Sequence, residues 1–460
     1  MAHDRSHDLG PGACMTRRRG LVLLVAAALT IAAASPAGAV PPVPGPDRIL
    51  FGGTLGLQAR EAELGRKLDV VRVYNPWTTG PTLNQAAFAP LTAGGTRTLL
   101  VSTSIDWPSW KSTAEARNRD ADPNNNLPVP WCRYAPVVPG TGTGSGKTWF
   151  GAVADGDYDT VIRSWLQRVE ELATGVPEMY VTFQHEPDRL SDSLAAQQYQ
   201  QCVGTPAEYR AAWARFRAVA DGVTPAGGTD LDAGQGGHLR WVPVFTTWGT
   251  WHTTATSTEP ERALINPWTG QPKLGATGDD LTLRSSRATA WLPDPARYDW
   301  VGADVFNYSG SVAGSSSPNG VRVDDPGTPD QEEDRWRELS VLVQPVMRWA
   351  TYNAALPGGG ERPIVLAEYG SVPDPTRPGR RATWLANACG FLTSTASSRF
   401  LIADYFDTNQ MRLATWNWIR QPDGSWKTTS LTGSDTSSVQ ALATAGRAAR
   451  FGGTGACPAP

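Results

Sequence analysis

Residues Met179–Pro187 read MYVTFQHEP, a short apolar run that ends in a histidine, a glutamate and a proline. A second run, Pro363–Gly370, reads PIVLAEYG and carries a glutamate near its end. Both runs are short, rich in β-branched or aromatic residues and bounded by Gly or Pro, which is typical of buried parallel strands. Catalytic groups of α/β barrels collect where such strands end. We therefore expect Glu186 and Glu368 to lie in one site.

Strand-like segments of this kind recur along the chain and alternate with helix-like segments. The expected strands are Arg48–Gly53, Val70–Tyr74, Thr98–Ser102, Met179–Phe183, Trp241–Phe245, Trp300–Val305, Pro363–Ala367 and Phe400–Tyr405. Eight strands that alternate with helices over one long domain favour an α/β fold of the (β/α)8 TIM barrel type. An open doubly wound sheet is the alternative, but no Gly-rich phosphate fingerprint follows the first strand.

The expected helices have recognisable beginnings. Thr205-Pro-Ala-Glu208 is a capping box with proline at the first helical position, and it predicts a helix that runs to Ala220. Asp159 is expected to cap another helix. Further helices are expected over Glu338–Asn353, Arg380–Thr395 and Ser437–Phe451. Long loops over 108–146, 246–280 and 307–329 follow strand ends, where a barrel keeps its binding face.

The beginning of the chain has the pattern of a secretory signal peptide. Arg17–Arg19 supplies a positive region, residues 20–34 are apolar, and Ala37-Gly-Ala39 offers a cleavage site. A membrane anchor is the alternative, but the apolar run is too short to span a bilayer. We expect residues 1–39 to be removed, with Met15 as an alternative start. Residues 40–460 would then form a single catalytic barrel domain that is secreted and extracellular.

The cysteine count agrees with export. Four cysteines follow the signal segment, and an even number in an exported chain predicts two disulfides. Of the three connectivities that are open, we favour Cys132–Cys202 together with Cys389–Cys457. Buried free thiols are the alternative.

Several function classes lack their sequence signals. The net charge of −3 gives no electrostatic support to a nucleic-acid or anionic-membrane partner. The run from Gly142 to Thr148, GTGSGKT, is out of register for a phosphate loop, and neither H-E-x-x-H nor G-x-S-x-G occurs. We expect a monomer that uses no metal and no cofactor.

Tryptophan is unusually frequent, with 19 residues against 11 Phe and 11 Tyr. Many lie in Pro- and Gly-rich loops, and a flat indole suits stacking on the apolar face of a sugar ring. Trp107, Trp248 and Trp416 are candidates for such contacts. The alternative is that these side chains pack long loops onto the scaffold.

The segment from Asp157 to Glu186 resembles clan A retaining glycoside hydrolases and is most similar to family 26, whose members include β-mannanases. In that clan the acid/base glutamate ends the fourth strand and the nucleophile ends the seventh, commonly within a Glu-aromatic-Gly motif. This chain has His185-Glu186 and, in the later run, Glu368-Tyr369-Gly370. The helix that begins T-P-A-E-Y-R-A-A-W also resembles the one that follows the acid/base strand in family 26.

The resemblance implies a role for each of these residues. Glu186 would be the acid/base and Glu368 the nucleophile, with Arg72 supporting the nucleophile. It also implies that Tyr308 hydrogen-bonds the nucleophile and that Trp416 lies under the sugar that is cleaved. His185 would orient Glu186 or contact the substrate, a polysaccharide or oligosaccharide. The chain departs from the family after the acid/base residue, where it reads Pro187-Asp-Arg-Leu. The sugar, β-mannan or a related β-glycan, therefore stays open.

Two glutamates of this kind hydrolyse a β-glycosidic bond by double displacement when their carboxyl groups lie about 5–5.5 Å apart. We expect a raised pKa at Glu186, which must donate a proton, and expect Arg72 to keep Glu368 ionised. The alternative from another class is a non-catalytic carbohydrate-binding or cell-wall barrel.

Overall fold

The computed structural model describes residues 47–53, 57–74, 98–103, 147–173, 178–188, 203–222, 239–247, 287–307, 337–373, 377–406, 431 and 435–459. All of them belong to one compact unit, Gly38–Pro460. The expected signal peptide lies outside the described residues. No helix within the described ranges is both long and apolar enough to cross a bilayer.

The centre of the molecule is a nine-stranded parallel sheet in which the first and last strands pair with each other. The strands are β1 (Leu50–Gly53), β2 (Val70–Tyr74), β3 (Thr98–Thr103), β4 (Met179–Phe183), β5 (Leu239–Trp241), β6 (Val244–Thr246), β7 (Val301–Asn307), β8 (Ile364–Ser371) and β9 (Phe400–Tyr405). All eight predicted strands are present, and the fifth is split into β5 and β6. The order is sequential, β5-β4-β3-β2-β1-β9-β8-β7-β6.

The split strand joins the two ends of this order. β5 pairs with β4, and β6 pairs with β7. Between them, the Val242 amide donates to the carbonyl of Val181 at 2.9 Å, and the carbonyl of Pro243 accepts from Gly302 at 2.8 Å. Because proline has no N–H to donate, the ladder to β4 stops at this point and the chain passes to the other neighbour. The sheet therefore closes into a (β/α)8 barrel, which excludes the open doubly wound alternative.

The barrel interior is filled by side chains that come from nearly every strand. This inner cluster consists of Leu50, Val70, Leu100, Tyr180, Val242, Val244, Val365, Ala367 and Ile402. On β7 the inward position is Gly302, where a Cβ atom would lie 2.6 Å from Val244 Cγ2. The interior is thus a packed layer of branched side chains, as is usual in this fold.

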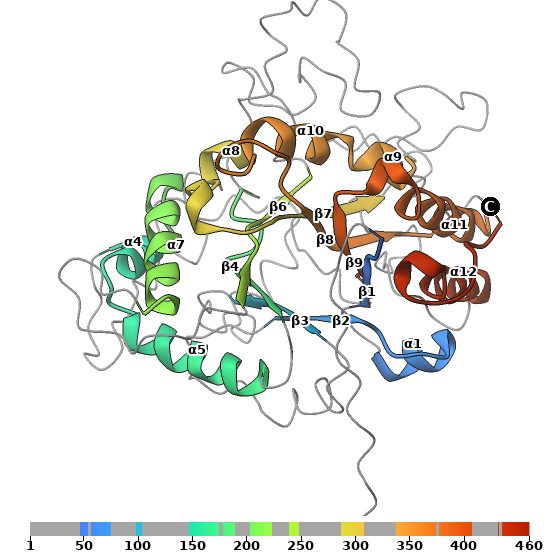
Figure 1. Ribbon diagram of the computed structural model, residues 1–460, viewed down its shortest axis with the longest axis horizontal. Coiled ribbons are helices and arrows are strands. Elements are labelled where there is room, and N and C mark those ends of the chain that lie inside the picture. The colour runs from blue at the N-terminus through green and yellow to red at the C-terminus, as the bar shows by residue number, and fades with distance from the viewer. Residues whose placement is uncertain are drawn as a thin grey trace, which may run out of the picture. The chain divides into compact units, whose positions relative to one another are not determined.

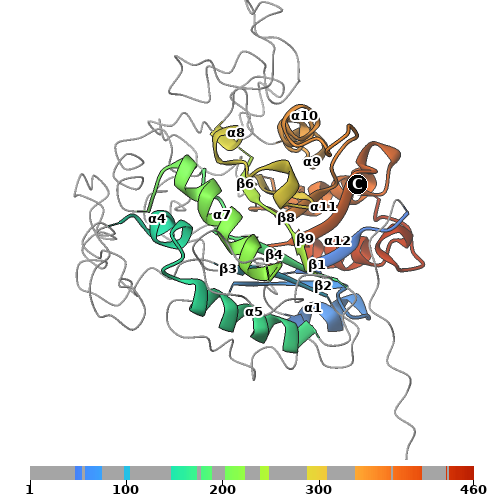
Figure 2. The same ribbon diagram turned by 60° about the vertical axis from the view of Figure 1, so that its left-hand side comes forward.

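Helices cover the outside of the strands (Figures 1 and 2). The α-helices are α1 (Leu57–Leu64), α4 (Trp149–Ala154), α5 (Asp159–Ala173), α7 (Pro206–Ala220), α8 (Arg287–Trp291), α9 (Leu339–Leu342), α10 (Gln344–Asn353), α11 (Arg380–Leu392) and α12 (Thr436–Gly446). A second, larger apolar cluster lies between the helices and the outward faces of the strands. It includes Trp165, Trp213 and Trp349, so part of the unusual tryptophan content is core.

One helix prediction is confirmed in detail, and three need correction. The helix predicted over Ser437–Phe451 is α12, which ends at Gly446 and is followed by a separate 3-10 turn over Ala449–Phe451. The capping box of α7 is formed, and the carboxylate of Glu208 also accepts from Thr148 Oγ1 at 2.9 Å, which ties α7 to α4. Asp159 begins α5 rather than capping it, and it pairs with Arg215. The helix predicted over Glu338–Asn353 is two helices, because Pro345 cannot donate the hydrogen bond that would continue α9 into α10.

The C-terminus is held to α11 by a disulfide between Cys389 and Cys457, with the Cα atoms 5.7 Å apart. This pairing confirms the prediction. The closed loop is long, with a sequence separation of 68, and cross-links of this kind typically stabilise a fold by about 2–4 kcal/mol. Cys132 and Cys202 lie outside the described residues.

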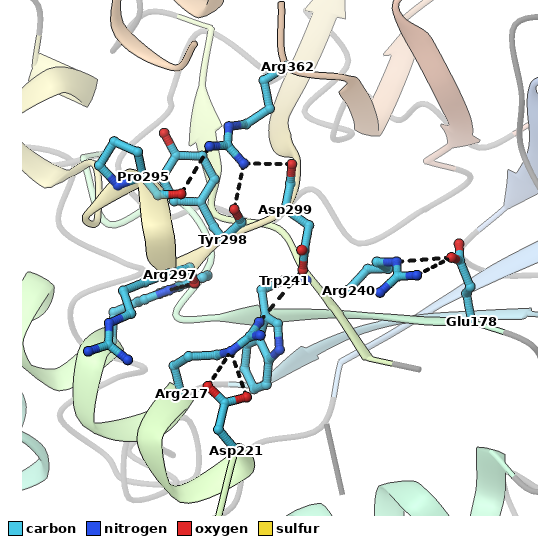
Figure 3. A network of polar contacts seen from close by, with 11 residues as sticks. Glu178, Arg217, Asp221, Arg240, Trp241, Pro295, Arg297, Tyr298, Asp299 and Arg362 are labelled. Carbon is cyan, nitrogen blue, oxygen red and sulfur yellow. Dashed lines mark hydrogen bonds and ion pairs between the residues drawn. The ribbon is translucent and has the colours of Figure 1, made fainter. Parts of the chain in front are cut away.

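A polar network closes the end of the barrel where the strands begin (Figure 3). Arg362, which precedes β8, is 2 % exposed. Its guanidinium donates to the carbonyls of Asp299 at 2.8 Å and Pro295 at 3.0 Å and also to that of Tyr298, and it lies 4.2 Å from the Tyr298 ring centroid. One side chain thus satisfies several buried carbonyl groups, which is a stabilising role.

Replacing Arg362 by methionine should destabilise the protein by about 3–5 kcal/mol, because it leaves those carbonyls buried without a donor. The control is Arg240→Met. Arg240 forms a more exposed ion pair with Glu178, at 2.7 Å, in the same network, and exposed pairs contribute about 0–1 kcal/mol. Urea unfolding measures both variants. Equal losses in the two would contradict the assignment.

Candidate active site

β2 contributes two polar side chains to the interior of the barrel. Along Val70–Tyr74 the side chains alternate, so Val71 and Val73 pack outward against the helices while Val70 lies in the inner cluster. Arg72 and Tyr74 share the inward face with Val70. Both therefore point toward the end of the barrel where the strands finish.

β8 brings Glu368 to the same place by an irregularity in its pairing with β7. Ala303 is opposite Leu366, but the next residue, Asp304, is opposite Glu368, so β8 holds one extra residue here. Val365 and Ala367 face the interior. Strict alternation would turn Glu368 outward, but the bulge lets Ala367 and Glu368 both face inward. Bulges often occur next to active sites, where they redirect a side chain in this way.

Arg72 lies between two carboxylates that are buried with it. Its Nη1 atom is 3.2 Å from Asp304 Oδ1 and 3.4 Å from Glu368 Oε1. The side chains of Arg72 and Asp304 are fully buried, and that of Glu368 is 6 % exposed. Burial opposes the charge of Arg72, but the neighbouring negative groups hold its pKa above the ordinary value. The site therefore contains a permanent cation shared by two acids.

The segment after β4 has an unusual backbone. Gln184 and Glu186 have φ angles of 48° and 52°, and they are the non-glycine residues with positive φ in the described part of the chain. Hydrogen bonds hold them, from Gln184 N to the Thr103 carbonyl at 2.7 Å and from Glu186 N to the Val244 carbonyl at 2.9 Å. Left-handed backbone at a residue with a side chain costs about 1–3 kcal/mol and occurs preferentially at functional sites.

His185 lies among three carboxylates. Its Nε2 atom is 2.7 Å from Asp304 Oδ2, 3.6 Å from Glu368 Oε1 and 3.7 Å from Glu186 Oε2. The two glutamate oxygens can therefore be no farther apart than 7.3 Å, the combined length of their distances to this nitrogen. Glu186 and Glu368 thus lie in one site, within reach of a single sugar ring.

Burial and, second to it, the charge of Asp304 raise the pKa of Glu368 to about 7, although Arg72 and His185 act to lower it. This corrects the expectation that Arg72 keeps Glu368 ionised. The desolvation of a fully buried carboxylate outweighs one shared guanidinium. Near neutral pH, Glu368 is therefore poised between its protonated and its ionised forms.

The structure brings four of the predicted site residues together, namely Arg72, His185, Glu186 and Glu368. The others, Tyr308, Trp107, Trp248 and Trp416, lie outside the described residues.

Two site residues were not predicted from the sequence. Tyr74 donates its hydroxyl hydrogen bond to Glu368, and Asp304 contacts both Arg72 and His185. Both could have been found from the sequence. Tyr74 comes two residues after Arg72 and therefore points to the same side of β2, and Asp304 is an acidic residue within a buried strand.

His185, Asp304 and Glu368 are also a set of residue types that could hold a metal ion, with ligand atoms that all lie within 4.8 Å of one another. The guanidinium of Arg72 already contacts the carboxylates of Asp304 and Glu368. A divalent cation would have to share these carboxylates with a fixed positive charge. The donor set therefore fits an Arg-neutralised acid pair better than a metal centre.

Glycine at position 186 should be more stabilising than alanine by about 1 kcal/mol, because only glycine adopts positive φ without strain. Elsewhere the order is reversed, and glycine costs about 0.5–1 kcal/mol relative to alanine. Glu178, at the other end of β4, is the control, where the alanine variant should be the more stable. Thermal unfolding of the four variants compares the two positions. The same order at both would show that residue 186 is not strained.

No protein-family model matches this chain, and neither does any curated protein sequence. Similar solved structures are glycoside hydrolases. The catalytic domain of a family 26 endo-β-1,4-mannanase from Bacillus sp. JAMB-750 has 11 % identity and a TM-score of 0.40, covering 88 % of this chain and 86 % of that one. A GH5_18 protein from Bifidobacterium longum subsp. infantis has 12 % identity and a TM-score of 0.41, covering 86 % and 78 %.

A family 39 glycoside hydrolase from Bacteroides cellulosilyticus WH2 has 11 % identity and a TM-score of 0.40, and it covers 88 % of this chain. The match spans 65 % of that longer protein. Family 26, which the sequence motifs predicted, is among the families of these similar structures.

Proposed function

We propose that this chain is a secreted retaining glycoside hydrolase that cleaves β-glycosidic bonds of a polysaccharide by double displacement. The observation that carries the proposal is the approach of Glu186 and Glu368 to one histidine nitrogen, with Arg72 behind Glu368. Two carboxyl groups within reach of one sugar are the equipment that such hydrolysis needs. A buried acid whose pKa is near neutrality, set among charged partners, is typical of catalytic sites and favours an enzyme over a binding protein.

In the first step, an oxygen of Glu368 attacks the anomeric carbon while Glu186 gives its proton to the departing glycosidic oxygen. The C–O bond to the leaving sugar breaks, and a covalent glycosyl ester forms on Glu368. In the second step, Glu186 takes a proton from a water molecule, which attacks the same carbon and releases Glu368 as a carboxylate. Proton and charge balance over the two steps.

The other site residues would act on these two glutamates. Arg72 stabilises the carboxylate form of Glu368, which is both the attacking and the released species. His185 lies 3.7 Å from Glu186 and is held by Asp304, so it can orient the acid/base residue. Export is proposed from the N-terminal signal pattern. β-Mannan or a related β-glycan is proposed as the substrate from the family 26 motifs.

Hydrolysis of β-mannan, β-glucan and xylan by the wild type should be reduced at least about 10³-fold in both Glu186→Gln and Glu368→Gln, because each loses a reacting group. Glu178→Gln is the control. It removes a glutamate from the opposite end of β4, where Glu178 pairs with Arg240, and should retain full activity. Reducing-sugar release measures all four proteins. Full activity in both site variants would refute the enzyme assignment.

The stereochemistry of the products distinguishes the roles of Glu186 and Glu368. Azide should restore turnover of an activated aryl β-glycoside in Glu186→Ala and give the β-azide, because the ester on Glu368 still forms. In Glu368→Ala, azide should take the place of the missing nucleophile and give the α-azide. NMR identifies the two products. An inverted first product from the wild type would show that Glu368 does not form an ester.

The pH profile should report the unusual pKa of Glu368. Since Glu368 must be ionised to attack, kcat/KM should rise with pH through about 7. Asp304→Asn removes a negative charge that raises this pKa, so the rise should move to lower pH. Asp294→Asn, at an exposed turn, is the control and should leave the profile unchanged. A shift to higher pH in Asp304→Asn would contradict the charge arrangement.

A further inference from the structure

Tyr74 has two different environments at its two ends. Its hydroxyl group donates a hydrogen bond to Oε1 of Glu368, a residue that is only 5 % exposed. Tyr74 as a whole is nevertheless 41 % exposed. The inward hydroxyl and the open ring therefore lie next to each other, at the point where the reaction proposed above would occur.

We propose that Tyr74 positions Glu368 through its hydroxyl group and presents its open ring to the sugar that Glu368 attacks. The inference rests on the proposed function and adds a residue that the family motifs do not supply. It gives one side chain on β2 two separable roles, one in turnover and one in binding.

The first role follows from which oxygen of Glu368 is held. Tyr74, Arg72 Nη1 at 3.4 Å and His185 Nε2 at 3.6 Å all approach Oε1. A carboxylate that is held through one oxygen keeps the other for the new bond, so Oε2 is the attacking atom. Burial of the hydroxyl raises the pKa of Tyr74 well above its ordinary value. Tyr74 therefore remains a hydrogen-bond donor wherever the enzyme works.

The second role follows from the surroundings of the ring. The guanidinium carbon of Arg72 is 4.9 Å from the ring centroid, and the His185 ring lies 5.8 Å away at an angle of 55°. The guanidinium of Arg72 thus lies over the ring, and Tyr74 as a whole is still 41 % exposed. The other exposed large apolar residues of the described chain, Tyr352 and Leu356, belong to the helical layer at and after α10. An amphipathic aromatic ring beside the nucleophile suits the C–H face of a sugar.

Two substitutions separate the roles. Tyr74→Phe keeps the ring and should lower kcat about 10- to 100-fold with KM within about twofold, because one charge-assisted hydrogen bond is lost. The acid limb of its pH profile should move to higher pH, since the carboxylate form of Glu368 loses a donor. Tyr74→Leu should show the same loss in kcat and, in addition, a KM raised about tenfold. Tyr352→Leu is the control and should match the wild type.

A wild-type kcat and acid limb in Tyr74→Phe would overturn the positioning role, and equal KM values in the Phe and Leu variants would overturn the ring contact. A measurement that does not depend on catalysis distinguishes failure of this inference about Tyr74 from failure of the proposed function. NMR titration of the Glu368 carboxyl group should show a higher pKa in Tyr74→Phe than in the wild type. An unchanged pKa overturns the positioning role even if no polysaccharide is cleaved.

Discussion

The candidate active site depends on the buried positive charge of the Arg72 guanidinium. It lies between Asp304 and Glu368, and neither carboxylate could stay ionised at such depth without a cation nearby. The compensation is partial, because one positive charge serves two acids and the pKa of Glu368 still rises to about 7. A fully compensated carboxylate would be a structural ion pair. Partial compensation leaves an acid that can react near neutral pH.

Two local distortions bring the reacting groups to this cation. The bulge in β8 turns Glu368 into the interior, and the left-handed backbone after β4 holds Glu186 within 3.7 Å of the same His185 nitrogen that Glu368 approaches. Both distortions cost conformational energy, and both occur where the strands end. At the other end of the barrel, Arg362 satisfies buried carbonyls. The end that carries the reactive groups thus holds the described non-glycine residues with positive φ, while the opposite end supplies stability.

Much of the fold could be predicted because each strand carries its own signal. A strand was found at each of the eight predicted places, with the fifth in two pieces, since short β-branched runs bounded by Gly or Pro usually form buried strands in a long α/β chain. The predicted boundaries were wrong where a single proline interrupts the periodic pattern of a strand or helix. Pro243 splits the fifth strand, and Pro345 splits a helix that periodicity alone would continue. At the site, Arg72, His185 and the two glutamates were found from motifs, whereas Tyr74 and Asp304 were not.

The sequence by itself determined the (β/α)8 arrangement of strands and helices and the pair of glutamates near the ends of the fourth and seventh predicted strands, and it favoured the disulfide between Cys389 and Cys457 among the pairings that were open. Only the tertiary structure decided which way Glu368 points, because the parity of a strand is lost at a bulge, and this bulge is defined by the pairing of β8 with both of its neighbours, β7 and β9. It also decided the protonation of Glu368. A pKa depends on burial and on charges from other strands, and neither is written in the residues next to it.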